Sequence, residues 1–147
     1  MRTIVSILLT ALLAAVLAAP ATAGEVEKSV PFELEKWHEL EVTDGPLTLH
    51  RIRVTELSGV KSTIFRPGNS EYLTDVQVQI EYSNPSEDDV EADVEIHWLD
   101  AQGRIIDGYD DEEDFDDEER HEEQTITLST LKYGLEVADT LRFTIRW

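Results

Sequence analysis

Three segments of the chain alternate strictly between apolar and polar residues, and this alternation limits the fold more than any other feature of the sequence. The segments run from Val76 to Tyr82, from Val90 to Trp98 and from Leu141 to Trp147. Successive side chains of a β-strand point to opposite faces, so each segment is predicted to be a half-buried strand. The residues of the apolar phase predicted to be buried are Val78, Ile80, Val94, Ile96, Trp98, Phe143 and Ile145.

Weaker alternation over residues 32–54 and 126–128 extends this pattern to seven or eight short strands about ten residues apart. The phase slips between Leu49 and Ile52, which predicts a bulge near His50 or Arg51. No segment after residue 23 has a convincing helical period. The predicted fold class is all-β, a single antiparallel Ig-like β-sandwich.

The amino terminus has the pattern of a signal peptide. Arg2 supplies a positive charge, residues 4–19 are almost wholly apolar, and Ala21-Thr22-Ala23 is a small-x-small cleavage site. The apolar run is shorter than the roughly 20 residues that span a bilayer, so cleavage is favoured over a retained anchor. We therefore expect a signal peptide at 1–23 and one mature domain at 24–147, exported to a bacterial periplasm or secreted.

The chain carries a formal net charge of −20 and contains no cysteine. A charge of this sign and size argues against nucleic acid or an anionic membrane as a partner, and favours cations or a basic protein. The missing cysteine excludes disulfides and a lipid anchor. A secreted domain of this length without disulfides needs a hydrophobic core.

The most acidic segment is 107–123, where twelve of seventeen residues are Asp or Glu. Repulsion between neighbouring carboxylates disfavours collapse, so we expect a solvated acidic loop. Carboxylate oxygens are also the ligands that Ca²⁺ prefers. An EF-hand does not fit, because Phe115 stands where the turn glycine is needed. Weak Ca²⁺ binding is the alternative to having no cofactor, and its candidate ligands are Asp110, Asp111, Glu112, Asp114, Asp116 and Asp117.

Other side chains suggest little chemistry. Trp98 and Trp147 fall on the apolar phase of their strands, whereas Trp37 lies between two alternating runs and is the candidate exposed aromatic for ligand binding. The four histidines show no local metal-binding spacing. No serine lies in a G-x-S-x-G elbow, and no pair of carboxylates has environments that would separate their pKa values. We therefore expect no catalytic residue and no enzyme activity.

Residues 76–106 and 141–147 resemble small exported bacterial Ig-like domains of the FxLYD kind. The shared pattern is a strand, an Asn-containing turn, a second strand ending in aromatic-x-Asp-x-x-Gly, and a final strand. The segment from His97 to Gly103 is also similar to the W-x-D-A-x-G turn of YcfL-type envelope proteins. The resemblance implies a β-sandwich and contributes no catalytic residue.

Together these features predict an exported, soluble, non-enzymatic binding or accessory module of the cell envelope. The alternative is a divalent-cation-binding protein that uses the acidic segment 107–123. No membrane anchor is expected after cleavage.

Overall fold

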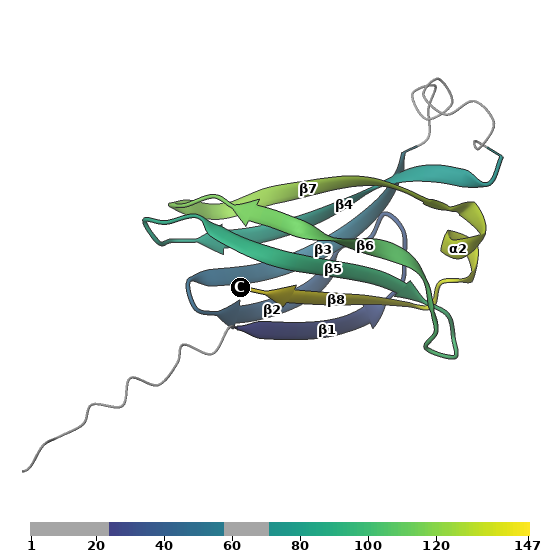
Figure 1. Ribbon diagram of the computed structural model, residues 1–147, viewed down its shortest axis with the longest axis horizontal. Coiled ribbons are helices and arrows are strands. Elements are labelled where there is room, and N and C mark those ends of the chain that lie inside the picture. The colour runs from purple at the N-terminus through teal and green to yellow at the C-terminus, as the bar shows by residue number, and fades with distance from the viewer. Residues whose placement is uncertain (1–23, 58–70) are drawn as a thin grey trace, which may run out of the picture.

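A computed structural model of the 147-residue chain describes residues 24–57 and 71–147, which form eight strands and one short helix (Figure 1). The predicted signal peptide at 1–23 lies outside the described residues. In chain order the elements are β1 Glu25–Pro31, β2 His38–Asp44, β3 Leu47–Leu57, β4 Leu73–Asn84, β5 Val90–Leu99, β6 Ile105–Phe115, β7 Glu119–Leu131, α2 Lys132–Val137 and β8 Thr140–Arg146.

The strands form two four-stranded sheets that pack face to face (Figure 1). One sheet, here called sheet A, has the order β1-β8-β5-β6, and the other, sheet B, has the order β2-β3-β4-β7. All the strand pairs within the sheets are antiparallel. This arrangement confirms the predicted all-β sandwich. It also makes β6 and β7 the edge strands on one side of the molecule.

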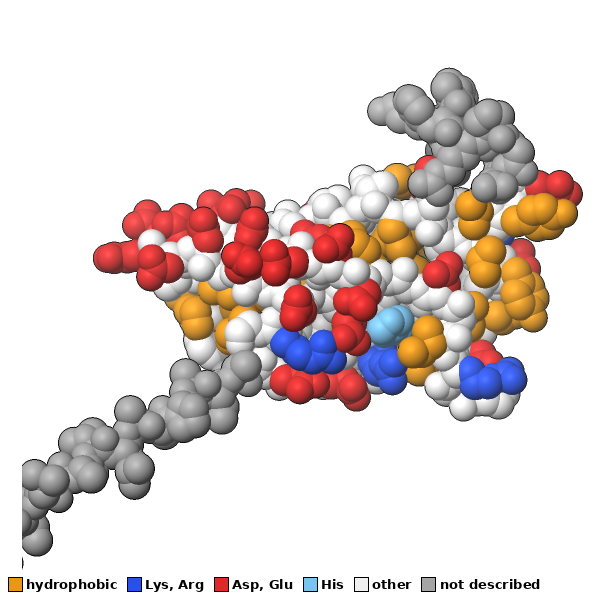
Figure 2. Space-filling view, viewed as in Figure 1, with side chains coloured by type: hydrophobic (Ala, Val, Ile, Leu, Met, Phe, Trp, Pro, Cys, Tyr) orange, Lys and Arg blue, Asp and Glu red, His pale blue; other side chains and the backbone are white. Residues whose placement is uncertain are grey.

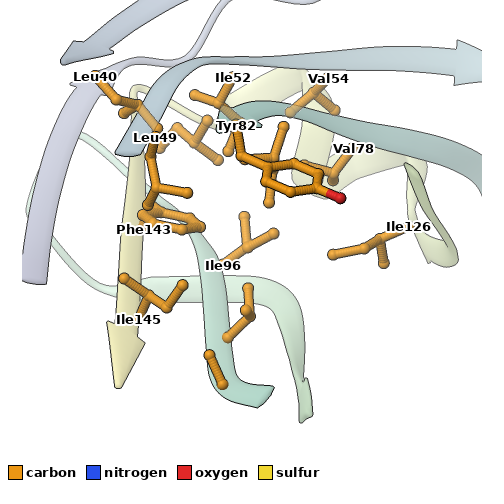
Figure 3. Packing of buried hydrophobic residues seen from close by; sticks show 14 of the residues in the cluster. Leu40, Leu49, Ile52, Val54, Val78, Tyr82, Ile96, Ile126, Phe143 and Ile145 are labelled. Atoms are coloured by element: carbon orange, nitrogen blue, oxygen red, sulfur yellow. The ribbon is translucent and has the colours of Figure 1, made fainter. Parts of the chain in front are cut away.

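The core lies between the two sheets (Figure 3). It contains all seven residues predicted to be buried. Each of them is at most 1% exposed. Trp98 is the largest, and its indole Nε1 donates a hydrogen bond of 3.0 Å to Thr130 Oγ1 on β7. That bond satisfies the polar atom of a fully buried aromatic and ties the two sheets together.

The predicted acidic loop at 107–123 is wrong, because most of this segment is strand. Residues 107–115 belong to β6 and residues 119–123 to β7, so that only 116–118 connect them. An edge strand can carry many carboxylates, since one backbone edge and one face remain in water. Two inward carboxylates are instead structural: Asp107 accepts hydrogen bonds from Thr130 Oγ1 and Leu131 N, and Glu113 accepts them from Tyr109 and Gln124.

The connection between β6 and β7 is held against the end of the sandwich. Phe115 is fully buried and meets Tyr82 edge to face, with ring centres 5.0 Å apart. The backbone N–H of Asp116 donates to the Tyr82 hydroxyl at 3.1 Å, and that of Glu118 donates to the Ser86 carbonyl at 3.0 Å. The acidic turn is therefore docked on the turn between β4 and β5.

The opposite end of the sandwich carries α2 and a group of exposed apolar side chains (Figure 2). They are Tyr72, Ile105, Leu131 and Tyr133. The helix has six residues, too few to produce the periodic pattern from which a helix is predicted. Within 24–57 and 71–147, no helix has the length and hydropathy needed to cross a membrane.

Candidate functional site

The antiparallel register of β5 and β6 places acidic residues directly opposite one another. Glu91 pairs with Asp114, Asp93 with Glu112, and Glu95 with Asp110. These six residues, called here the acidic face, alternate with inward residues such as Val94 and Ile96, so they lie on the outer side of sheet A. Side chains in such pairs have Cβ atoms about 4.5–5.5 Å apart, and like charges at this distance destabilise a sheet. Acidic side chains gather at the end where β5 begins and β6 ends (Figure 2).

Only one carboxylate of the acidic face has a cationic partner among the described residues. Arg146, on the neighbouring strand β8, donates to Glu95 and also lies 3.4 Å from Glu25. This hydrogen bond lowers the pKa of Glu95 below its usual value. Within the described part of the chain, the other five form no ion pair.

The acidic face carries unrelieved repulsion. The negative charge of Glu91, followed by a hydrogen bond shared with it, raises the pKa of Glu112 above its usual value of 4.5. The face also borders a shallow pocket of about 310 Å³ lined by Glu91, Asp93, Glu112, Arg146 and Trp147. Trp147, predicted to lie in the core, is only half-buried. A cation placed here would meet three carboxylates and the indole ring of Trp147.

The six candidate Ca²⁺ ligands are all exposed, but the strand divides them. Asp110, Glu112 and Asp114 lie on the outer side of β6, whereas Asp111 is opposite the inward Val94. Asp116 and Asp117 belong to the turn that follows. Across the described ranges, no group of three or more His, Asp or Glu residues could hold a metal ion. The structure therefore does not gather the six carboxylates around one point.

Trp37 was expected to be an exposed aromatic, but it is half-buried on the outer side of sheet B. The guanidinium carbons of Arg51 and Arg53 each lie 4.5 Å from the centre of its ring. Both arginines belong to the outer phase of β3, where residues two apart point the same way. The two cations occupy ring surface that a ligand would need, so Trp37 supports sheet B more than it offers a binding platform.

Two histidines far apart in sequence meet on the outer side of sheet B, and sequence spacing gave no sign of this. In β3, Leu49 pairs with Tyr82 and Arg51 with Glu81, which makes His50 the extra residue of a bulge and confirms the predicted bulge. In β7, a second bulge makes His121 the extra residue, with a left-handed φ of 59°. Since β4 lies between these strands, the two bulges bring the His50 ring and the His121 backbone N–H to the same Ser83 hydroxyl.

The rings of His50 and His121, here called the histidine pair, are stacked. Their centres are 4.2 Å apart, with an angle of 19° between the planes. His50 Nε2 lies 2.8 Å from Ser83 Oγ, and His121 Nδ1 lies 3.2 Å from Glu81 Oε1. The other oxygen of Glu81 accepts two hydrogen bonds from Arg51, of 2.6 and 2.8 Å. The pair is thus held from β4 by a hydroxyl and a carboxylate.

No protein-family model and no curated protein sequence matches the chain. The resemblance to FxLYD and YcfL-type domains therefore stays a prediction.

Proposed function

We propose that this chain is an exported, soluble, non-enzymatic binding module of the bacterial cell envelope, and that it holds a basic protein partner on the acidic face. The observation that carries the proposal is the β5–β6 register, which sets three carboxylate pairs opposite one another; among residues 24–57 and 71–147, a cation pairs with only one of the six. Like charges in this position oppose folding. A basic partner would relieve that repulsion, so binding and relief of the repulsion are coupled.

The place of β6 in the sheet also suits a partner strand. Within the described residues it is the last strand of sheet A, so one backbone edge is open to a further strand. Extended peptides bind such edges through main-chain hydrogen bonds, with alternate side chains giving specificity. A second copy of β6 would be repelled by its own charges, whereas a strand with alternating Lys or Arg would be attracted. The charges therefore select a basic strand over self-association.

Export is supported by the amino-terminal sequence. Residues 1–23 have the charge, apolar run and cleavage site of a signal peptide, and the acidic composition suits a protein that stays in solution.

The experiment measures binding of a labelled peptide with alternating Lys and Thr by fluorescence anisotropy at low and high NaCl. We expect saturable binding that weakens steeply with salt, because the Debye length falls from ~10 Å at 0.1 M to ~3 Å at 1 M. Neutralising the outer residues of β6 together, as Asp110→Asn, Glu112→Gln and Asp114→Asn, should remove most of the binding.

The matched control removes the same charge elsewhere. Glu39, Glu71 and Glu136 are exposed, lie away from the acidic face, and can be changed together to Gln. This variant should bind the peptide nearly as well as the unaltered chain. Equal loss in both variants would mean that net charge alone attracts the peptide, and the proposed site would then be wrong.

A further inference from the structure

The outer side of β6 changes its chemistry along the strand. Trp98 points into the core, so the next residue, Leu99, and its partner Ile105 lie on the outer side of sheet A. The same side of β6 then passes Gly108 and continues with three carboxylates of the acidic face. The outer row of β6 is therefore apolar where the strand begins and acidic where it ends.

Ile105 belongs to a group of four exposed apolar side chains, here called the apolar end, which also contains Tyr72, Leu131 and Tyr133. Ile105 is 54% exposed and Tyr133 is 68% exposed. The helix α2, which carries Tyr133, packs on the beginning of β6, since a Cβ added to Gly134 would lie 3.1 Å from Cγ2 of Ile106. Hydrophobic and acidic side chains gather toward opposite ends of the molecule (Figure 2). Exposed apolar side chains that lie together mark interaction sites.

No charged side chain of β6 separates the apolar end from the acidic face on the outer row. Gly108 stands between them, opposite His97. A Cβ added to Gly108 would lie 2.2 Å from the carbonyl oxygen of Ile96 and 2.8 Å from Cδ2 of His97, so the imidazole ring lies against the glycine. A segment bound along β6 can therefore contact both surfaces.

We propose that the partner is an extended basic segment with one large apolar or aromatic residue, placed about four residues beyond its last lysine or arginine. The inference rests on the proposed function, which places the basic residues opposite the acidic face. Ile105 and Tyr133 then remove the apolar residue from water. β5 gives the spacing, because Leu99, opposite Ile105, and Glu95, opposite Asp110, are four positions apart, or ~13 Å in a strand.

The beginning of β6 is less open to main-chain pairing than its acidic part. The backbone N–H of Leu131 on β7 donates a hydrogen bond of 3.1 Å to the Asp107 carboxylate, so β7 already adjoins β6 there. Main-chain pairing with a partner is therefore expected along residues 110–114, and side chains supply the contact beyond Gly108. Two anchors of different chemistry fix the direction of the segment. A second copy of the chain is disfavoured, because it would bring together two net charges of −20.

The test compares three labelled nine-residue peptides by fluorescence anisotropy with the unaltered chain. All have lysine at the first, third and fifth positions. The first peptide has phenylalanine at the ninth position, the second has it at the second position, and the third has none; threonine fills the other positions. An antiparallel partner would place the ninth position next to Ile105. We expect the first peptide to bind about ten-fold more tightly than the other two, because only its phenylalanine becomes buried.

The matching change in the protein removes the apolar contact and keeps the acidic face. Ile105→Ser with Tyr133→Ser should lower the affinity for the first peptide to that for the third, and should leave the affinity for the third unchanged. Tyr72→Ser is the control, because this tyrosine is 66% exposed but directly precedes β4 of sheet B. It should keep most of the preference for the first peptide.

The outcomes separate this inference from the proposed function. No saturable binding of any peptide would overturn both. Equal, salt-sensitive binding of all three would leave the acidic face as the binding surface and overturn the inference, and so would a preference for the first peptide that persists in the folded double variant. Sedimentation of the chain alone should show a monomer; a dimer that the double variant lacks would assign the apolar end to a second copy and overturn the inference. Thermal unfolding shows whether the variant folds, and the comparison of the peptides on the unaltered chain decides the question if it does not.

Discussion

Two strand pairs, β3–β4 in sheet B and β5–β6 in sheet A, carry charge in opposite arrangements on their outer sides. On sheet B, Arg51 is opposite Glu81 and Arg53 is opposite Gln79, whose amide in turn donates to Glu123 on β7. On sheet A, the acidic face sets carboxylates of β5 opposite carboxylates of β6. The same antiparallel geometry therefore yields complementary pairs between β3 and β4 and like-charge pairs between β5 and β6.

This contrast separates cross-strand charge pairs that stabilise the fold from those that do not. Cross-strand pairs of opposite charge each contribute modestly to a sheet, whereas like pairs oppose it. The fold tolerates the acidic face because its stability comes from the interior, where both sheets bury apolar residues. The outer side of β5 and β6 is thus free to carry charges that suit a partner.

The largest expected effect tests whether the inner faces of the two sheets are equally well packed. Ile96 lies beneath the acidic face and Ile80 beneath the polar face of sheet B, and both are fully buried. Changing either to Ala should lower the free energy of unfolding by about 2–5 kcal/mol, measured by urea denaturation. Suppose that Ile96→Ala lowered the free energy of unfolding by less than about 0.5 kcal/mol while Ile80→Ala lowered it by several. The acidic face would then lie on a loosely packed sheet, and the two sheets would not contribute equally to the core.

The next effect comes from breaking a complementary pair. Arg51→Gln removes both hydrogen bonds to Glu81 and should lower the free energy of unfolding by about 1 kcal/mol, since the pair is only partly buried. Lys36→Gln is the control, because its ion pair with Glu33 is exposed on both sides and should matter less. Equal effects of the two changes on the free energy of unfolding would show that the Arg51–Glu81 pair stabilises sheet B no more than an exposed ion pair does.

The pH dependence of this pair has a defined sign. Desolvation raises the pKa of Glu81, but hydrogen bonds from His121 and Arg51 outweigh it, and the pKa is lowered from 4.5. The stabilisation is therefore present above pH 4.5 and is lost as the pH falls through the lower, folded value. Acid titration of unfolding should show this loss in the unaltered chain and a smaller one in Arg51→Gln.

A smaller effect of opposite sign is expected on the acidic face. The variant Asp110→Asn, Glu112→Gln, Asp114→Asn should melt at a higher temperature than the unaltered chain at low salt, and the difference should vanish at high salt. Because Glu91 raises the pKa of Glu112, lowering the pH through that raised value towards 4.5 should also relieve the repulsion and stabilise the fold. A lower melting temperature in the variant would show that these carboxylates support the structure.

The strands that were predicted correctly are those whose inward positions carry apolar residues in strict alternation with polar ones. The strands around Ile80, Ile96 and Phe143 were identified from alternation, and the slip near His50 indicated a bulge that the structure confirms. The segment 107–123 was misjudged because charge hides its alternation: Tyr109 and Phe115 are the only large apolar residues on the inward phase of β6 beyond Gly108. An edge strand needs few such anchors.

The histidine pair could not be predicted because it depends on register. His50 and His121 are 71 positions apart. They meet only because β4 lies between their strands and both strands bulge next to Tyr82, β3 between the partners of Glu81 and Tyr82 and β7 between those of Tyr82 and Ser83. The contacts of Trp37 with two arginines have the same origin. Strand order and register are long-range properties that alternation in one segment does not specify.

The smallest expected effect is the difference between Ca²⁺ and Na⁺ at equal ionic strength. Because the alternation of β6 sends Asp110 and Asp111 to opposite sides, both salts should act by screening, and their melting curves should overlap. A true site would instead stabilise the fold with the logarithm of Ca²⁺ concentration above its dissociation constant. The control variant changes five candidate ligands to Asn, namely Asp110, Asp111, Asp114, Asp116 and Asp117. A rise in melting temperature at millimolar Ca²⁺ that occurs in the unaltered chain and not in this variant would favour the cation-binding alternative over a basic partner. The carboxylates would then converge on an ion, which their positions on the strand do not suggest.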